Sequence, residues 1–65
     1  MRKKERIDPF LQKFGELWKE YPDLRFGQLF QNVAHLSNID PFYLEEWQFE
    51  DLIKEFREKY PNGRL

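Results

Sequence analysis

The stretch FEDLIKEFREKY, residues 49–60, decides the fold class of this protein. Its large apolar side chains recur at spacings of three and four residues, which is the repeat of one helix face and not of a strand. They are Phe49, Leu52, Ile53, Phe56 and Tyr60. One turn earlier the stripe meets Glu45 and Glu46, and acidic residues there suit the positive end of a helix dipole. We therefore expect a helix from about Glu46 to Lys59.

The residues just before this helix do not continue its apolar stripe. Asp40-Pro41-Phe42 has the chemistry of a helix start, yet the periodicity breaks at Glu45 and Glu46. We therefore expect residues 41–44 to form a separate turn or extended piece that directs Phe42 or Leu44 into the core.

The same Asp-Pro-Phe tripeptide occurs near the N-terminus, at residues 8–10. Asp can cap the first amides of a helix, and Pro fits the first helical position because it has no N–H to leave unpaired. A second apolar stripe continues from there at helical spacing, ending where Pro22 restricts the residue before it. Its members are Phe10, Phe14, Leu17, Trp18 and Tyr21. This pattern predicts a helix that begins at Asp8-Pro9 and ends near Tyr21.

A middle helix is expected from about Leu24 to Leu36. Asp23 offers an N-cap after Pro22, and Ser37-Asn38 provides turn chemistry at the other end. Gly27 lies within this run, where glycine costs up to about 1 kcal/mol relative to Ala. It therefore indicates either a position near the helix terminus or close packing against the turn that holds Trp18.

These patterns predict an all-α, compact three-helix domain with a short turn or extended segment before the third helix. A chain of 65 residues is long enough for one small core. We expect a single domain over residues 1–65, with a basic arm at residues 1–7 and a mobile polar tail at residues 61–65.

The composition argues against an enzyme. The sequence has no Cys and one His, His35, and it contains no catalytic triad, phosphate-binding glycine loop or zinc motif. The carboxylates around Glu46 and Glu50 are read as a solvated acidic face, because they lack the loop geometry of a calcium site. We expect no catalytic residue, no metal site and no cofactor.

The location is expected to be cytoplasmic. No apolar run approaches the roughly 18 residues that a membrane span needs, and residues 1–6 lack the apolar segment of a signal peptide. We expect no membrane partner.

Aromatic residues make up 18% of this chain, which either gives a small domain a sufficient core or leaves some rings for a partner surface. Tyr and Trp are frequent anchors of protein interfaces, and several of the rings here do not fit the core stripes. We predict a partner-binding surface of Phe42, Tyr43 and Trp47 with an acidic rim of Glu45 and Glu46. A basic protein or a second copy would cover it. The alternative is that Trp47 covers the edge of the core while Tyr43 reaches solvent with its hydroxyl group.

Nucleic-acid binding is the competing hypothesis. Three short helices can form a helix-turn-helix, and a basic arm can enter a minor groove. The arm would supply Arg2, Lys3, Lys4 and Arg6, and the middle helix a polar face of Arg25, Gln28, Asn32 and His35. The acidic third helix would repel phosphates, and the net charge is −1, so we prefer the protein-interaction hypothesis.

Residues 18–29 carry the pattern Trp-x-x-x-Pro-Asp-Leu-Arg-x-Gly-Gln-Leu, and Asp-Pro-Phe-Tyr occurs later at residues 40–43. This combination resembles a group of small uncharacterised bacterial and phage proteins and, more loosely, the YihD-like family of unknown function. The likeness covers most of residues 6–56. Trp47 departs from it, since relatives often look acidic there. The resemblance implies a compact, mainly helical cytoplasmic domain, and it supplies no catalytic residue.

Overall fold

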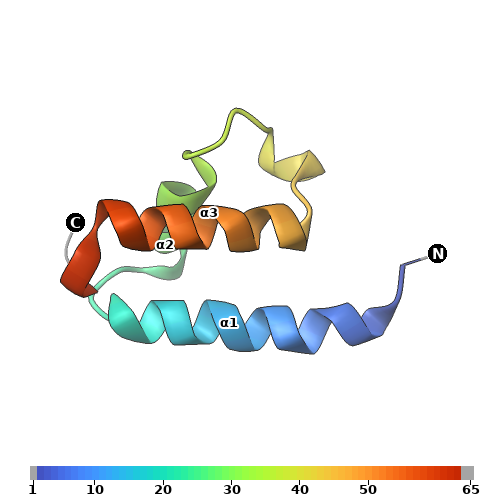
Figure 1. Ribbon diagram of the computed structural model, residues 1–65, viewed down its shortest axis with the longest axis horizontal. Coiled ribbons are helices and arrows are strands. Elements are labelled where there is room, and N and C mark those ends of the chain that lie inside the picture. Colours follow the sequence, from blue (N-terminus) through green and yellow to red (C-terminus); the bar gives the residue numbers. More distant parts are fainter. Residues whose placement is uncertain (1, 64–65) are drawn as a thin grey trace.

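The computed structural model describes residues 2–63, and within that range it contains three α-helices and no strand (Figure 1). They are α1 (Ile7–Glu20), α2 (Phe26–Ala34) and α3 (Glu46–Lys59). Three short 3-10 turns accompany them: η1 (Lys4–Arg6), η2 (Pro41–Tyr43) and η3 (Pro61–Gly63). The predicted all-α, three-helix domain is confirmed.

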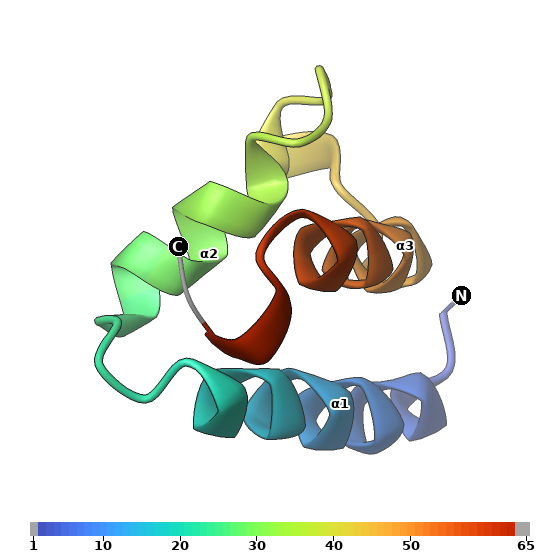
Figure 2. The same cartoon turned by 60° about the vertical axis from the view of Figure 1, so that its left-hand side comes forward.

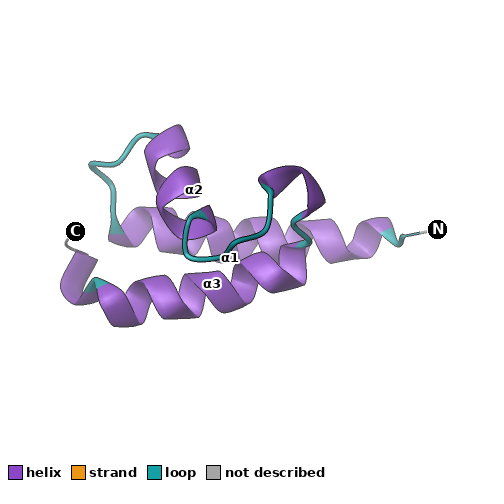
Figure 3. Cartoon of the chain, turned by 90° about the horizontal axis from the view of Figure 1, so that it is seen from above, coloured by secondary structure: helices purple, strands orange, loops and turns teal. Residues whose placement is uncertain are grey.

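Helices α1 and α3 lie side by side and run in the same direction, so their N-terminal ends share one end of the molecule (Figures 1 and 3). Hydrogen bonds between side chains show the same parallel arrangement. Arg6 donates to Glu46 at one end of the two helices, and Arg57 donates to Glu20 at the other end. The shorter α2 lies obliquely above α1, on the same side of it as α3 (Figure 2).

The core forms where the three helices meet, and each predicted apolar stripe contributes to it. Its buried residues are Leu17, Tyr21, Leu29, Val33, Ala34, Phe49, Leu52, Ile53 and Phe56. The polar side-chain atom among them, the Tyr21 hydroxyl, donates to the Tyr60 carbonyl oxygen at 2.6 Å. The core is therefore apolar and its tyrosine is hydrogen-bonded, as buried polar groups require.

The prediction for the third helix is confirmed at both ends, Glu46 and Lys59. The separate turn before it is also present, as η2. Of the two residues expected to direct a side chain inward, Leu44 packs against the core while Phe42 is exposed.

The predicted start of the first helix is wrong by two residues. Helix α1 begins at Ile7 with Arg6 as its N-cap, so Asp8 lies inside the helix and caps nothing. Pro9 is tolerated there because the first four amides of a helix have no intrahelical partner.

The chain termini also differ from the expected arm and tail. Residues 4–6 of the arm form η1, which leads directly into α1, and residues 61–63 of the tail form η3. Met1 of the expected arm and residues 64–65 of the expected tail lie outside the described residues.

The middle helix is shorter than predicted at both ends. Its N-cap is Arg25 and not Asp23, because the Gln28 side chain accepts a hydrogen bond from the Arg25 backbone amide at 2.8 Å. Gly27 therefore lies in the first turn of α2, and a Cβ added to it would meet no atom within 4 Å. The near-terminal interpretation of Gly27 holds, and the predicted close packing against Trp18 is wrong.

Candidate interaction surface

The turn η2 is closed by two hydrogen bonds to its cap residue, Asp40. The Asp40 carboxylate accepts a hydrogen bond from the Phe42 amide at 2.9 Å, and the Asp40 carbonyl accepts one from the Tyr43 amide at 2.8 Å. Pro41 fixes one backbone angle of the turn, and Leu44 anchors its end against the core. The backbone between Asp40 and Leu44 is therefore preorganised.

This turn directs two large rings into solvent. Phe42 is 85% exposed, although Phe is a residue that cores usually bury, and Tyr43 is 70% exposed. Their rings pack edge to face with centroids 4.9 Å apart, a favoured geometry for aromatic pairs. We call these two residues the aromatic turn.

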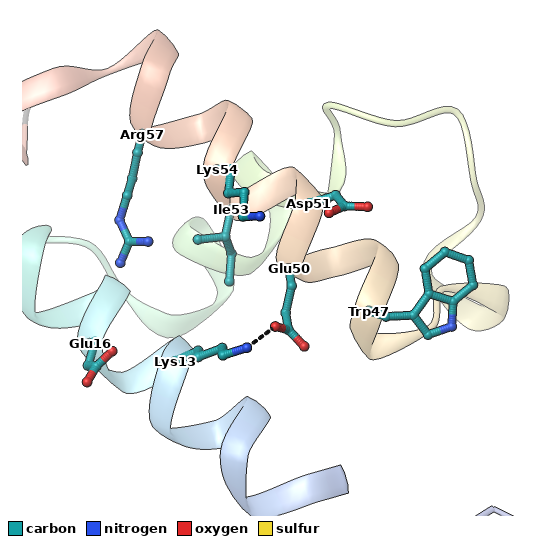
Figure 4. A pocket seen from close by; sticks show the side chains of 8 residues that line it. All are labelled: Lys13, Glu16, Trp47, Glu50, Asp51, Ile53, Lys54 and Arg57. Atoms are coloured by element: carbon teal, nitrogen blue, oxygen red, sulfur yellow. Dashed lines mark hydrogen bonds and ion pairs between the residues drawn. The ribbon is translucent and has the colours of Figure 1, made fainter.

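Trp47, the third predicted member of the surface, lies in the first turn of α3 and is 59% exposed. Within residues 2–63 it stacks on no other aromatic ring, so it does not join the aromatic turn as one cluster. Figure 4 shows its indole at one end of the open groove between α1 and α3, beyond Glu50 and Asp51. The structure thus brings Phe42 and Tyr43 together and leaves Trp47 as a separate exposed ring.

The predicted acidic rim is already paired within the chain. Arg2 contacts Glu45 at 2.6 Å, and Arg6 contacts Glu46 at 2.7 Å. Each pair joins the basic N-terminal segment to the start of α3, about 40 residues later in the sequence. The negative charge that we expected to attract a basic partner is therefore matched by the chain's own arginines.

Two further ion pairs lie along the contact between α1 and α3. Lys13 pairs with Glu50, and Arg57 donates two hydrogen bonds to Glu20 at 2.7 and 3.0 Å. The hydrogen bond to Glu20 raises the pKa of Arg57, which remains a cation in either case. Partly exposed pairs of this kind contribute little energy each, about 0–1 kcal/mol, but they define the register of the two helices.

The residues of the nucleic-acid hypothesis are placed on separate elements. Lys3 and Lys4 are exposed beside the paired Arg2 and Arg6. On α2, Arg25, Gln28 and His35 are exposed while Asn32 is half-buried. The Gln28 side-chain oxygen accepts a hydrogen bond from the Arg25 backbone amide at the start of α2, and His35 is the C-cap of that helix.

Sequence reasoning missed a second exposed apolar area. Ile7, Leu11 and Phe26 are 43%, 55% and 56% exposed. Phe26 had the spacing of a buried residue, but α2 begins at that position, and its ring packs on Trp18 from outside the core. The other two were predictable, because Ile7 and Leu11 lie four residues apart and off the stripe of Phe10.

No family model, curated protein or solved structure matches this chain. None of the helices in the described part of the chain has the length and apolar character needed to cross a bilayer. Across residues 2–63, no three acidic or histidine side chains converge in a way that could hold a metal ion.

Proposed function

We propose that this protein is a non-enzymatic binding module that contacts another protein through the aromatic turn, with Trp47 as an additional contact. The observation that carries the proposal is the exposure of Phe42 and Tyr43 on a turn whose backbone is fixed by Asp40. The protein would act by occlusion or scaffolding, as an accessory or regulatory component.

The energetic argument concerns what these rings gain on binding. Each aromatic side chain removes about 150–250 Å² from water when it is buried, which at about 25 cal/mol per Å² is worth several kcal/mol. Because the turn is already hydrogen-bonded in the free protein, binding orders little additional backbone. Exposed rings on a fixed turn have the properties of interface hot spots.

The charge pattern indicates the chemistry of the partner. Glu45 and Glu46 pair with Arg2 and Arg6, and Glu50 pairs with Lys13, so most of the carboxylates near Trp47 are matched by cations of the same chain. This arrangement supports a partner that presents an apolar pocket for the rings with a polar rim, the usual anatomy of a protein interface. It does not support a partner selected by strong positive charge.

Photocross-linking tests the proposal in cells of the source organism. A photoreactive amino acid replaces Tyr43 in one variant and Glu55, an exposed residue of α3, in a control variant. We expect a single protein to be cross-linked from position 43 and not from position 55. Its affinity for the purified chain should then fall about 10- to 100-fold in Phe42→Ala and Tyr43→Ala, the usual effect at hot spots, and not in Glu55→Ala.

Equal affinity for the alanine variants and the parent chain would overturn the proposal. The nucleic-acid hypothesis has its own readout, an NMR titration with mixed-sequence duplex DNA at low salt. Chemical-shift changes confined to Lys3, Lys4 and Arg25, lost on adding salt, would replace protein binding with DNA binding as the function.

A further inference from the structure

Gly15 lies in the middle of α1, where the fold gives no reason for a glycine. Glycine in a helix interior is less stable than Ala, so such a residue usually serves a close approach of another backbone. A Cβ added to Gly15 would meet no atom within 4 Å outside its own helix. Gly63 shows the opposite case, because its φ is 69° and an added Cβ would lie 2.3 Å from the Glu20 carbonyl oxygen. Packing within the single chain therefore does not require a glycine at position 15.

The neighbours of Gly15 form an apolar stripe on the outer flank of α1. Leu11, 55% exposed, precedes Gly15 by one turn, and Ile7 precedes Leu11 by another. The exposed Phe26 ring extends the stripe beyond Trp18 at the other end, with ring centroids 5.9 Å apart. Helices α2 and α3 both lie on one side of α1 (Figure 2), and the exposure of Leu11 and Ile7 shows that they leave this flank largely open to solvent. We call Leu11, Gly15 and Ile7 the α1 flank.

The charges at the ends of the α1 flank have opposite signs. Asp8 lies three residues before Leu11, and Lys19 lies four residues after Gly15, so all four share one helix face. Both charged side chains are exposed. Along the helix, this face therefore presents an acidic residue, a bulky apolar residue, a glycine without a side chain and a basic residue. Two such faces are complementary to each other when they run antiparallel.

We propose that a second copy of this chain packs on the α1 flank, with the two α1 helices antiparallel. Leu11 of each copy would lie over the notch left by Gly15 of the other, where the missing Cβ allows close approach. Asp8 of each copy would lie beside Lys19 of the other copy. A two-fold axis generates both contacts twice, as in an isologous dimer, and a net charge of −1 opposes association only slightly.

This dimer is independent of the proposed function. The aromatic turn and Trp47 belong to η2 and α3 and contribute nothing to the α1 flank. A dimer would therefore carry two aromatic turns and would bind a repeated partner with higher avidity.

Sedimentation equilibrium over a concentration series tests the dimer. We expect the parent chain to dimerise and Gly15→Gln to weaken the dimer at least tenfold, because the new side chain fills the notch. The same substitution should raise the urea midpoint of the monomer, since Gln is a better helix former than Gly. Glu16→Gln, an adjacent exposed position of α1, is the matched control and should leave the dimer unchanged.

Charge reversal tests the antiparallel arrangement. Asp8→Lys should weaken the dimer, because it places two cations together in each of the two contacts, and Lys19→Asp should weaken it in the same way. The double variant Asp8→Lys with Lys19→Asp should restore it. The proposal would be overturned by an unsubstituted chain that stays monomeric up to about 1 mM, or by a dimer that is insensitive to Gly15→Gln. It would also be overturned by a double variant that associates no better than either single variant.

Discussion

Residues 8–10 and 40–42 have the same sequence, Asp-Pro-Phe, and opposite structural outcomes. The first copy lies within α1, and its Phe10 ring packs 5.8 Å from that of Phe49 against the core. The second forms η2, and its Phe42 ring is 85% exposed. In the first copy the Asp is an ordinary helical residue, whereas in the second Asp40 caps the turn.

The difference arises from the residues on the C-terminal side of each tripeptide. After Phe10 the apolar repeat continues through Phe14 and Leu17, so the helix can extend while burying one face. After Phe42 the next inward-facing residue is Leu44, which ends the turn, and the ring has no helix face to join. The same tripeptide thus fits both the first turn of a helix and a capped turn, and the residues that follow it decide which aromatic ring supports the fold and which remains exposed.

The largest expected effect separates the two phenylalanines. Phe10→Ala should lower the free energy of unfolding by about 2–3 kcal/mol, because it removes a ring that packs on the core. Phe42→Ala should change it by less than about 0.5 kcal/mol, as is usual at exposed positions. Urea denaturation monitored by circular dichroism measures both, in a domain whose total stability is roughly 3–10 kcal/mol. Similar losses in the two variants would contradict the comparison.

The tyrosines extend the comparison. Tyr21→Phe should cost about 1 kcal/mol, because it removes the hydrogen bond to the Tyr60 carbonyl from a buried site. Tyr43→Phe should leave the free energy of unfolding nearly unchanged, since its hydroxyl group is on the surface. The same denaturation measurement applies, and a larger loss for Tyr43→Phe would reverse the assignment.

Alkaline pH should sharpen the contrast between the tyrosines. Burial, and secondarily the neighbouring Glu20, raises the pKa of Tyr21 above its ordinary value of 10.0. The unfolded chain then ionises at lower pH than the folded chain, so stability from this group is complete below about pH 10 and is lost as the pH rises through the folded pKa. Above about pH 10, the free energy of unfolding should fall less in Tyr21→Phe than in the unsubstituted chain. An unchanged pH dependence in this range would contradict burial of the Tyr21 phenol.

The smallest expected effect concerns the two aspartates. Asp40→Ala removes the cap of η2, which should expose the Phe42 amide to solvent and cost about 0.5–1 kcal/mol locally. Asp8→Ala removes only a favourable interaction with the helix dipole, about 0.3 kcal/mol at an exposed position. Hydrogen exchange by NMR should show faster exchange of the Phe42 amide in Asp40→Ala. Unaltered exchange would mean that the cap does not hold the turn.

Sequence periodicity was sufficient where the apolar stripe and the charge order agreed. Both indicators place α3 at residues 46–59, and the structure has the same bounds. Periodicity alone was insufficient for α2, because the apolar run begins at Leu24, two residues before the helix begins at Phe26. The Asp8-Pro9 pair predicted a wrong start for α1 for a related reason. A pair that is typical of helix caps can also fit inside the first turn of a helix that begins earlier.

The exposure of the predicted surface residues could be anticipated in part from the sequence, and their surroundings could not. The surplus of rings around residues 42–47 indicated an exposed surface, and the exposure of Phe42, Tyr43 and Trp47 agrees with that expectation. The pairing of Arg2 with Glu45 joins residues 43 positions apart, so it depends on the parallel packing of α1 and α3. Local spacing cannot predict such a contact.

The two tryptophans provide the most direct test that the aromatic surface is open in the free protein. Trp18 is half-buried and its indole N–H donates to the Leu24 carbonyl at 2.9 Å, whereas Trp47 is 59% exposed. Acrylamide quenching of fluorescence in Trp47→Phe reports on Trp18, and in Trp18→Phe it reports on Trp47. We predict severalfold stronger quenching of Trp47. Equal protection of both indoles would show that Trp47 is packed in the free chain, which would contradict its exposed position and remove it from the proposed binding surface.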